Sequence, residues 1–276
     1  MIKCVIHCAD IHIRNYHRHE EYAEQLSRFI GMCREIASKY EKGEVRIVVC
    51  GDIVHSKNVI SNELISLASN FLRELSTIAK VIVISGNHDT LVNNSSRKDT
   101  LTAIFETAGF DNCSFLDAML GYESGCITDE NIIWAVYSIF DGYRRPDIEG
   151  AVAGSAADNP KVIGLFHGPL VGCTLDSGMK MDKGSNASMF NGCDAVMCGD
   201  IHKRQVVKYG RKNAVYPGSL IQQTFGETVG EHGFAVWDIS KMKHQFVDLD
   251  SDYGLYKVEI NDIQDLDEDK EKFVNI

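Results

Sequence analysis

Five short apolar segments of the chain each end in aspartate, asparagine or histidine, the side chains that bind divalent metal ions through oxygen and imidazole nitrogen. In RIVVCGDIVHS (46–56), an apolar run ends abruptly in Gly51 and Asp52, and His55 follows three residues later. One such segment would indicate only a strand, a turn and a helix cap. The repetition of the pattern favours a metal site. The other four segments are CVIHCADIH (4–12), KVIVISGNHD (80–89), KVIGLFHGP (161–169) and DAVMCGDIH (194–202).

The apolar part of each segment predicts a strand that is buried on both faces, as in the middle of an α/β sheet. A glycine such as Gly51 lets the backbone turn sharply after the strand. The next side chain then emerges at the carboxyl end of the strand, where open α/β sheets place their ligand sites. The five strand ends are therefore the expected location of the chemistry.

Helices and further strands are predicted around these segments. Residues 22–40 and 61–78 carry apolar side chains three and four positions apart, which is the stripe of an amphipathic helix. A first half that alternates strands and helices, with a strand-rich second half, suggests two sheets packed face to face with helices outside. Later in the chain we expect a helix near 99–108, strands near 113–120 and 131–139, a surface segment over 141–160, a polar glycine-rich loop over 172–188, and strands from 205 onward.

The charge of the chain is unevenly distributed. The net charge is −11, but residues 248–276 hold ten acidic and three basic side chains, which leaves −4 for residues 1–247. This mild acidity says little about the substrate, because a site for two cations needs carboxylates of its own. The nine cysteines include no CxxC pair, so we expect free thiols in a reducing cytosol and no zinc site of thiolates. No apolar run approaches the ~18–20 residues of a membrane helix, and we expect a cytoplasmic protein without a membrane partner.

The order of the motifs, DxH, GDxxH, GNHD, an isolated HG and GxxH, resembles the calcineurin-like metallophosphoesterase superfamily over roughly residues 1–240. Within it, His55 and PGSLIQQTFGE (217–227) resemble the SbcD-type DNA-repair nucleases, a group that includes phage recombination endonuclease subunits. The resemblance implies an α/β fold of the metallophosphoesterase type, a four-layer α-β-β-α sandwich. It also implies a nuclease that uses two manganese ions.

The resemblance also implies a role for each motif residue. Asp52 would bridge two ions, and two ions held ~3.5–4 Å apart can activate a water and clamp both oxygens of an in-line displacement at phosphorus. His88 would orient or protonate groups at the scissile phosphate, and His55 would stabilise the transition state or the leaving oxygen. The first ion would take Asp10, His12 and His202, and the second Asn87, His167 and Asp200.

One motif departs from the pattern. SbcD-like nucleases usually carry GHxH in the fifth motif, whereas this chain carries GDIH, with Asp200 in place of the first histidine. An aspartate also binds a hard ion, so we expect the site to persist with a more anionic cluster. Oxygen and imidazole ligands favour manganese, or magnesium, over a metal that prefers softer ligands.

The remaining polar residues near the motifs receive structural or substrate roles. We expect His7 to be a packed core residue, and Asp89 to shape the turn after His88. His232 and His244 are expected at the surface. Four basic residues are candidate phosphate contacts: Arg14, Lys57, Lys203 and Arg204.

Three functions remain open from the sequence. The first is a manganese-dependent DNA endonuclease or exonuclease subunit of a recombination and repair complex. The second is a phosphatase or phosphodiesterase for proteins or small molecules. Protein phosphatases of the superfamily carry GDxVDRG and GNHE, whereas this chain has GDIVHSK and keeps Asp89, which favours the nuclease. The third, a catalytically silent subunit that only binds DNA or an ATPase, would predict the loss of at least one of Asp52, Asn87 or His88.

The resemblance carries expectations about partners and domains as well. It implies DNA and an SbcC-like ATPase subunit as partners, and a homodimer formed through the helix at 61–78, whose apolar face is broad. If a phage encodes the chain, the host cytoplasm, close to the nucleoid, is the expected location. We expect a nuclease core over 1–247 and, over 248–276, an acidic tail or the start of a capping domain.

Overall fold

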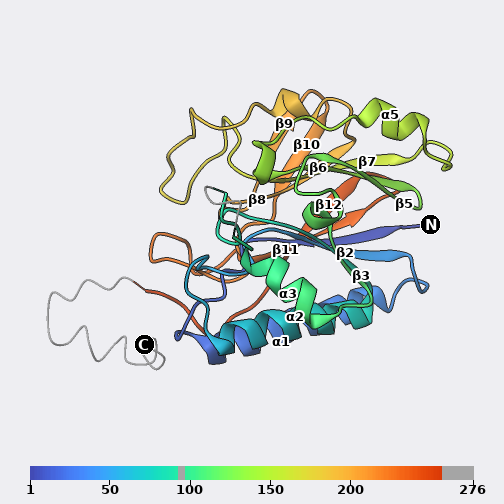
Figure 1. The fold of residues 1–276 in the computed structure, drawn as a ribbon. Helices are drawn as coiled ribbons and strands as arrows, with labels where there is room; N and C mark the ends of the chain where they lie inside the picture. Colours follow the sequence, from blue (N-terminus) through green and yellow to red (C-terminus); the bar gives the residue numbers. More distant parts are fainter. Residues whose placement is uncertain (93–96, 257–276) are drawn as a thin grey trace, which may run out of the picture.

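The structure is a computed structural model that describes residues 1–92 and 97–256. Two six-stranded sheets pack face to face (Figure 1). The first has the order β12-β11-β1-β2-β3-β4, in which β1 to β4 are parallel, β11 is antiparallel to β1, and β12 is antiparallel to β11. Its strands are β1 (Cys4–Cys8), β2 (Val45–Cys50), β3 (Lys80–Ile84), β4 (Cys113–Phe115), β11 (Gly233–Asp238) and β12 (Lys243–Asp248).

The second sheet has the order β5-β6-β7-β8-β10-β9. Its four central strands, β6, β7, β8 and β10, are parallel, and the edge strands β5 and β9 are antiparallel to their neighbours. The strands are β5 (Gly125–Asp129), β6 (Ile132–Tyr137), β7 (Lys161–His167), β8 (Ala195–Gly199), β9 (Gln205–Tyr209) and β10 (Lys212–Tyr216).

Helices cover the outer faces of both sheets (Figure 1). The helices α1, α2 and α3 pack on the first sheet, while α5 and the turn η2 pack on the second. This is the four-layer α-β-β-α sandwich that the sequence predicted. The elements are α1 (His19–Ala37), α2 (Asn62–Ile78), α3 (Thr100–Ala108), α4 (Leu116–Met119), α5 (Ile148–Ala153), and the 3-10 turns η1 (Ile139–Asp141) and η2 (Ala187–Phe190).

The layers arise from the alternation of side chains along the strands, because successive residues of a strand point to opposite faces. In β2, Ile47 and Val49 belong to the core beneath the helices, whereas Val48 and Cys50 pack between the sheets. All six residues of β2 are buried, which confirms the predicted strand with two covered faces. The shared core between the sheets brings the strand ends of one sheet beside those of the other.

Two segments near the middle of the chain differ from the prediction. The strand expected near 113–120 ends at Phe115 and continues as α4. This short helix directs the buried carboxylate of Asp117 inward, where it accepts the N–H of Ser85 at 2.7 Å and the hydroxyl of Ser138 at 2.5 Å. The edge strand β5 was not predicted, because its sequence GCITD lacks an apolar pattern. It forms by pairing with β6 across a tight turn.

Most apolar side chains of the helix α2 pack in the core of this chain. Leu64, Ala68, Phe71, Leu72 and Leu75 are buried in the core beneath the first sheet. Ile65 is 41% exposed. The broad apolar face that suggested a dimer is thus largely covered by the fold itself, and dimerisation stays a prediction.

The cysteines fit the expectation of free thiols. All nine cysteines are free, and seven of them are buried. Among residues 1–92 and 97–256, no helix combines the length and the apolarity needed to cross a membrane. The predicted tail or capping segment lies mostly beyond residue 256, outside the described residues.

Candidate metal centre

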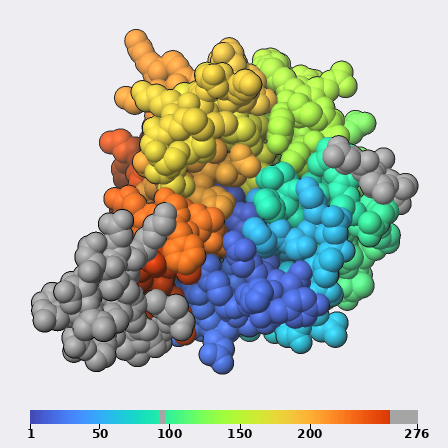
Figure 2. Space-filling model, turned by 90° about the vertical axis from the view of Figure 1, so that its left-hand side faces the viewer, coloured from blue at the N-terminus to red at the C-terminus, as the bar shows by residue number. Residues whose placement is uncertain are grey.

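The seven predicted ligands come together at one end of the sandwich. They lie at or just after the carboxyl ends of β1, β2 and β3 of the first sheet and of β7 and β8 of the second. Figure 2 shows this face, on which the blue N-terminal segment meets light-blue, orange and yellow segments that are far apart in the sequence. Four of the seven side chains are buried, namely Asp10, His12, Asp52 and His167. Asn87, Asp200 and His202 are partly exposed.

Asp52 lies between the two sets of ligands. Its Oδ2 atom is 3.4 Å from Nε2 of His12 and 3.3 Å from Nε2 of His167. Its other oxygen, Oδ1, accepts the backbone N–H of His88 at 2.8 Å. One oxygen therefore faces a histidine of each set, which is the arrangement that a bridging carboxylate requires.

The first set consists of Asp10, His12 and His202 around Asp52. The Nε2 atoms of His12 and His202 are 3.0 Å apart. Asp10 is fully buried, and both of its oxygens accept the backbone N–H of Asp200, at 2.9 and 3.1 Å. The ligand atoms of Asp10, His12 and His202 lie within 4.8 Å of one another, close enough to hold one ion.

The second set consists of Asn87, His167 and Asp200 around Asp52, and the orientation of Asn87 shows whether a cation fits between them. The Oδ1 atom of Asn87 lies 3.0 Å from Nε2 of His167, 3.3 Å from Oδ2 of Asp52 and 3.1 Å from Oδ1 of Asp200. An amide oxygen that faces only hydrogen-bond acceptors is repelled by them when the site is empty, whereas a cation between these atoms attracts all of them. Without a cation, a 180° turn of the amide would let its NH₂ group donate to the same three atoms. The donor set thus fits a hard divalent ion.

Hydrogen bonds fix which nitrogen of each histidine faces the centre. Nδ1 of His167 donates to the carbonyl of Cys50 at 2.7 Å, and Nδ1 of His202 lies 2.9 Å from Oε1 of Glu227. In both residues Nε2 is left to face the other ligands. Histidines that bind metals commonly donate their second nitrogen in this way, which fixes the ring and its tautomer.

The backbone at the centre is strained. Asp10, His12, Asp52 and Asp200 have φ angles of 53°, 52°, 54° and 89°, in the region that residues with a side chain rarely adopt. Such conformations persist where the surrounding structure enforces them, and they cluster at functional sites. Gly86 must stay a glycine for a related reason, because a Cβ atom there would lie 2.1 Å from Oδ1 of Asp52.

Asp89 has the structural role that the sequence predicted. Its Oδ2 accepts the N–H groups of Asp52 at 2.7 Å and Gly86 at 2.9 Å, and its Oδ1 accepts that of Val54 at 3.0 Å. Burial and the charge of Asp52 raise the pKa of Asp89 to about 8. Asp89 therefore ties the GDIVH and GNHD turns together without facing the ligands.

The charged groups of the centre shift one another's pKa values. Burial raises the pKa of Asp10 to about 7, against the opposing effect of His167 and His202. Burial also acts on Asp52, but the nearby histidines, His167 foremost, hold its pKa below the ordinary range. Although burial favours neutral imidazole, the carboxylates of Glu227 and Asp10 raise the pKa of His202 to about 9.

His55 and His88 form a pair beside the first set. Their rings stack at a centroid distance of 5.0 Å and an angle of 21°, and both present an edge to His12. Nδ1 of His88 donates to the carbonyl of His55 at 2.7 Å, which leaves its Nε2 available. Burial, with the charges of Arg14 and His88, lowers the pKa of His55 to about 4. His12, His55 and His88 also lie close enough together to hold an ion.

The four predicted phosphate contacts are placed differently from one another. Nη1 of Arg14 lies 3.3 Å from Nε2 of His55, and Nζ of Lys57 donates to the carbonyl of Asn87 at 3.2 Å. Lys203 follows His202 directly. Arg204 instead pairs with Asp248 and lies over the ring of Phe246 at 5.0 Å. Arg14 and Lys57 therefore border the ligand set, while the guanidinium of Arg204 is directed toward β12.

Three further histidines complete the comparison with the sequence. His7 is fully buried as predicted, and its Nε2 lies 3.1 Å from the carbonyl of Cys198 between the two sheets. His244 is half-buried against Trp237. The prediction that His232 is a surface residue was wrong. The chain folds back between β10 and β11, so that His232 is buried and its Nδ1 lies 3.0 Å from the hydroxyl of Ser219.

Glu227 is a part of the site that none of the five motifs indicates. Its Oε1 contacts His202, while its Oε2 accepts the N–H of Gln223 at 2.8 Å and contacts the hydroxyl of Ser219 at 3.2 Å. The side chain is 3% exposed. In the sequence, Glu227 stands out only as the last residue of PGSLIQQTFGE (217–227). That segment carries the resemblance to the SbcD-type nucleases, but it does not indicate a role for the glutamate.

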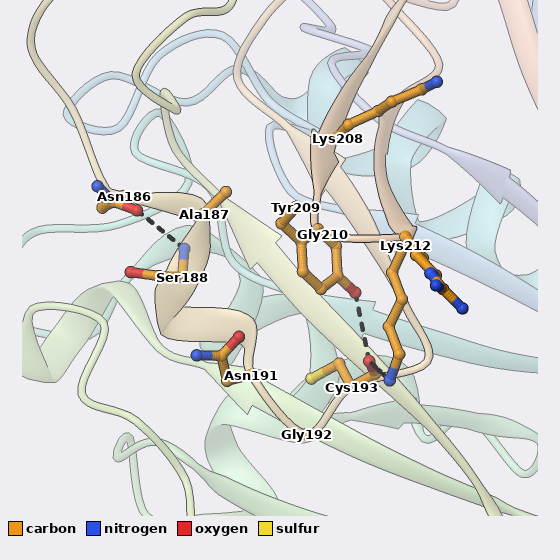
Figure 3. Close-up of a pocket in the computed structure, with 11 residues that line it drawn as sticks. Asn186, Ala187, Ser188, Asn191, Gly192, Cys193, Lys208, Tyr209, Gly210 and Lys212 are labelled. Carbon is orange, nitrogen blue, oxygen red and sulfur yellow. Dashed lines mark hydrogen bonds between the residues drawn. The ribbon is translucent and has the colours of Figure 1, made fainter.

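A separate depression of the described surface lies away from this centre. A cavity of about 480 Å³ lies at the hairpin between β9 and β10, at the opposite end of β9 from His202 (Figure 3). Its Lys212 is already engaged, because Nζ lies 2.5 Å from the carbonyl of Cys193 and 3.5 Å from Asp194. None of the predicted ligands lines this cavity.

Comparisons with known proteins agree with the geometry. The family profile of the calcineurin-like phosphoesterases matches residues 5–204. An uncharacterized protein of Acanthamoeba polyphaga mimivirus is 35% identical over 267 residues, which are 95% of this chain and 19% of that protein. A protein of Invertebrate iridescent virus 6, named as a candidate phosphoesterase, is 24% identical over 224 residues, 80% of this chain and 73% of that protein.

Among solved structures, the anchor in the inner membrane complex of Plasmodium aligns with a TM-score of 0.49 and 11% identity, over 90% of this chain and 89% of that one. The chain spans about a fifth of the length of the mimivirus relative. The family profile covers well over half of the chain and includes every strand end that carries a predicted ligand. The chain therefore belongs to the calcineurin-like phosphoesterase family.

Proposed function

We propose that the chain is a DNA nuclease that hydrolyses phosphodiester bonds with two divalent ions, manganese foremost and magnesium as the alternative. The family supports hydrolysis of a phosphoester, and the contacts of Asp52 with His12 of the first set and His167 of the second support a pair of ions. Bound ions would supply an activated water and neutralise the charge that develops at phosphorus. The protein residues would hold the ions and orient the substrate.

The position of His55 beside the predicted ligands is the observation that favours a nuclease over a phosphatase. Its ring stacks on His88, and its Nε2 lies 3.3 Å from the guanidinium of Arg14, so it stands at the border of the ligand set. In the protein phosphatases of the superfamily, the motif GDxVDRG carries an aspartate and an arginine where this chain has His55 and Ser56. A neutral imidazole there can donate to a phosphodiester or to its leaving oxygen.

Each side chain has a defined task in this proposal. Asp10, His12, Asp52 and His202 would hold one ion, and Asp52, Asn87, His167 and Asp200 the other. His88 would donate a proton or a hydrogen bond from Nε2, since its Nδ1 is bound to the carbonyl of His55. Arg14 and Lys57 would attract the phosphate chain toward the centre.

The proposal includes the partners that the sequence resemblance implied. We propose that the nuclease acts on DNA with an SbcC-like ATPase subunit, in the cytoplasm, and as a homodimer. Support for the dimer from α2 is limited to Ile65 and its partly buried neighbours, because the other apolar positions pack in the core. Light scattering at micromolar concentration tests this directly, and a monomer would remove the dimer from the proposal.

The experiment that tests the function compares substrates and metals. The purified chain is incubated with single-stranded and blunt duplex DNA, with phosphoserine peptide, and with nucleotide monophosphate, each with Mn²⁺, Mg²⁺ or a chelator. We expect DNA cleavage with Mn²⁺ and none with the chelator. Turnover of the peptide or the monophosphate without DNA cleavage would instead establish the phosphatase.

A matched pair of variants shows that any cleavage belongs to this site. Asp52→Asn keeps the shape of the bridging side chain and removes its charge. Asp248→Asn makes the same change at an exposed carboxylate that pairs with Arg204. We expect the first to abolish cleavage and the second to retain it, and equal cleavage by both would point to a contaminating nuclease.

A further inference from the structure

A groove lies beside the candidate metal centre, separated from the predicted ligand Asn87 by the side chain of Lys57. It lies between the segment that follows β2 and the start of α3, and it has a volume of about 310 Å³. Lys57 connects the two sites, because it lines the groove and its Nζ donates to the carbonyl of Asn87 at 3.2 Å. The segments that form the groove, light blue and turquoise, lie on the right-hand side of Figure 2. An extended substrate bound at the centre can therefore continue into the groove.

The lining of the groove divides into a cationic rim and an apolar floor. Lys57, Arg97 and Lys98 provide the cations, and Lys98 is partly neutralised by its ion pair with Glu106. Ile60, Ile65, Ala103 and Ile104 provide the apolar side chains. Asp99 contributes no open negative charge to this surface, because its buried carboxylate caps α3 through the N–H of Thr102 at 2.7 Å.

The side of the centre near His202 has no such cationic rim among its described residues. A depression of about 380 Å³ there includes Asp176, Asp200 and Glu227, and its described lining contains no lysine or arginine. Of these carboxylates, Asp176 is neither a predicted ligand nor paired with His202. A polyanion approaching the centre is attracted by Lys57 and Arg97 and repelled from the side of Asp176. The charge difference thus gives the substrate chain a direction across the centre.

We propose that this groove binds the nucleotide next to the scissile phosphodiester, in single-stranded form. The phosphate would contact Lys57 and Arg97, and the unstacked base would lie on the isoleucine floor. A base paired in a duplex keeps its faces stacked on its neighbours, whereas a single-stranded or frayed end can present a face to apolar side chains. The volume suits a small ligand such as one nucleotide. The proposal rests on the proposed function, since it names the form of DNA that the centre receives.

Two variants and one control test the groove. Arg97→Ala removes a rim cation, and Ala103→Trp fills the groove from an exposed position of α3. Lys208→Ala removes a matched exposed cation from the distant hairpin shown in Figure 3. Each variant is assayed with Mn²⁺ on a short single-stranded oligonucleotide, on a blunt duplex, and on bis(p-nitrophenyl) phosphate, a phosphodiester that has no neighbouring phosphate for the cationic rim to bind.

For single-stranded DNA we expect Arg97→Ala and Ala103→Trp to raise KM about threefold to tenfold with little change in kcat. Arg97→Ala should also reduce the slope of log affinity against log salt by about 0.7, as expected for one lost phosphate contact. Turnover of bis(p-nitrophenyl) phosphate should stay within about twofold of the unaltered chain, which shows that the centre is intact. Lys208→Ala should change none of these values.

The other outcomes separate the groove from the function. DNA cleavage with unchanged KM in both groove variants would overturn the groove and leave the nuclease standing. An equal rise in KM on the blunt duplex would show that Arg97 is only a general electrostatic contact for DNA, and it would also overturn the nucleotide site. If the unaltered chain hydrolyses bis(p-nitrophenyl) phosphate but neither binds nor cleaves DNA, the proposed function fails and the groove fails with it.

Discussion

Nδ1 of His202 lies 2.9 Å from Oε1 of Glu227, so a loop near the end of the fold orients a ligand of the first set. Glu227 is held in turn by the backbone N–H of Gln223 and the hydroxyl of Ser219. Since its side chain is only 3% exposed, the contact is shielded from water. The candidate centre therefore depends on a residue that is not itself a ligand.

Glu227→Gln should weaken the binding of one ion. The amide is a poorer acceptor than the carboxylate, so the ring of His202 loses its charged partner and part of its basicity. Loss of such a partner typically costs 10–100-fold in metal affinity. Isothermal titration calorimetry with Mn²⁺ measures this effect. Glu231→Gln is the control, because Glu231 is exposed and nearby. Equal affinities in both variants would show that Glu227 only packs the loop.

Asp200 is the sharpest test of the second ligand set. Asp200→Ala removes an oxygen that lies 3.1 Å from Oδ1 of Asn87, and we expect selective weakening of one ion with collapse of activity. Asp200→His should keep two ions and shift the metal preference, because imidazole replaces an anionic oxygen. Manganese stoichiometry distinguishes the variants. Two tightly bound ions and normal cleavage in Asp200→Ala would falsify the assignment of this ligand.

His55 and His88 should be separable from metal binding. His55→Ala and His88→Ala are expected to lower turnover by about 10²–10⁴-fold while two ions remain bound. The reason is that both histidines are proposed to transfer a proton or to stabilise developing charge, and neither is proposed to bind an ion. His17→Ala, at an exposed histidine, serves as the control. Calorimetry and initial rates are the measurements. A lost ion in either variant would mean that the three-histidine group with His12 holds a metal instead.

His7 should make the fold sensitive to acid. Burial lowers the pKa of His7 to about 3, so between pH ~6.5 and pH ~3 the unfolded chain binds a proton that the folded chain does not. The contribution to stability is therefore lost as pH falls through this window, by about 1.4 kcal/mol per pH unit. Urea unfolding in chelator between pH 7 and pH 5 measures the slope.

The variant that isolates this effect is His7→Gln, which cannot take up the proton and can still donate to the carbonyl of Cys198. We expect its unfolding free energy to vary with pH by about one proton less than that of the unaltered chain. His17→Gln, at an exposed site, should keep the original slope. Identical slopes for the unaltered chain and His7→Gln would show that His7 titrates normally in the folded state.

The sequence by itself determined most of the strands, the main helices and the polar side chains that gather at the strand ends. This was possible because each strand end carries its apolar run, its turn residue and its polar side chain within about ten consecutive positions. The burial of β2 and the amphipathic stripes of α1 and α2 are likewise local patterns. Asp89 could be assigned to its turn for the same reason.

Only the tertiary structure decided which side chains meet. The pairing of His202 with Glu227 and the burial of His232 depend on how the chain folds back between β10 and β11, and Arg204 turns to Asp248 across 44 positions. No periodicity records such contacts, because they form between segments that only the packing of the two sheets brings together. The groove beside Lys57 arises in the same way, from segments about 40 residues apart that meet at one edge of the first sheet.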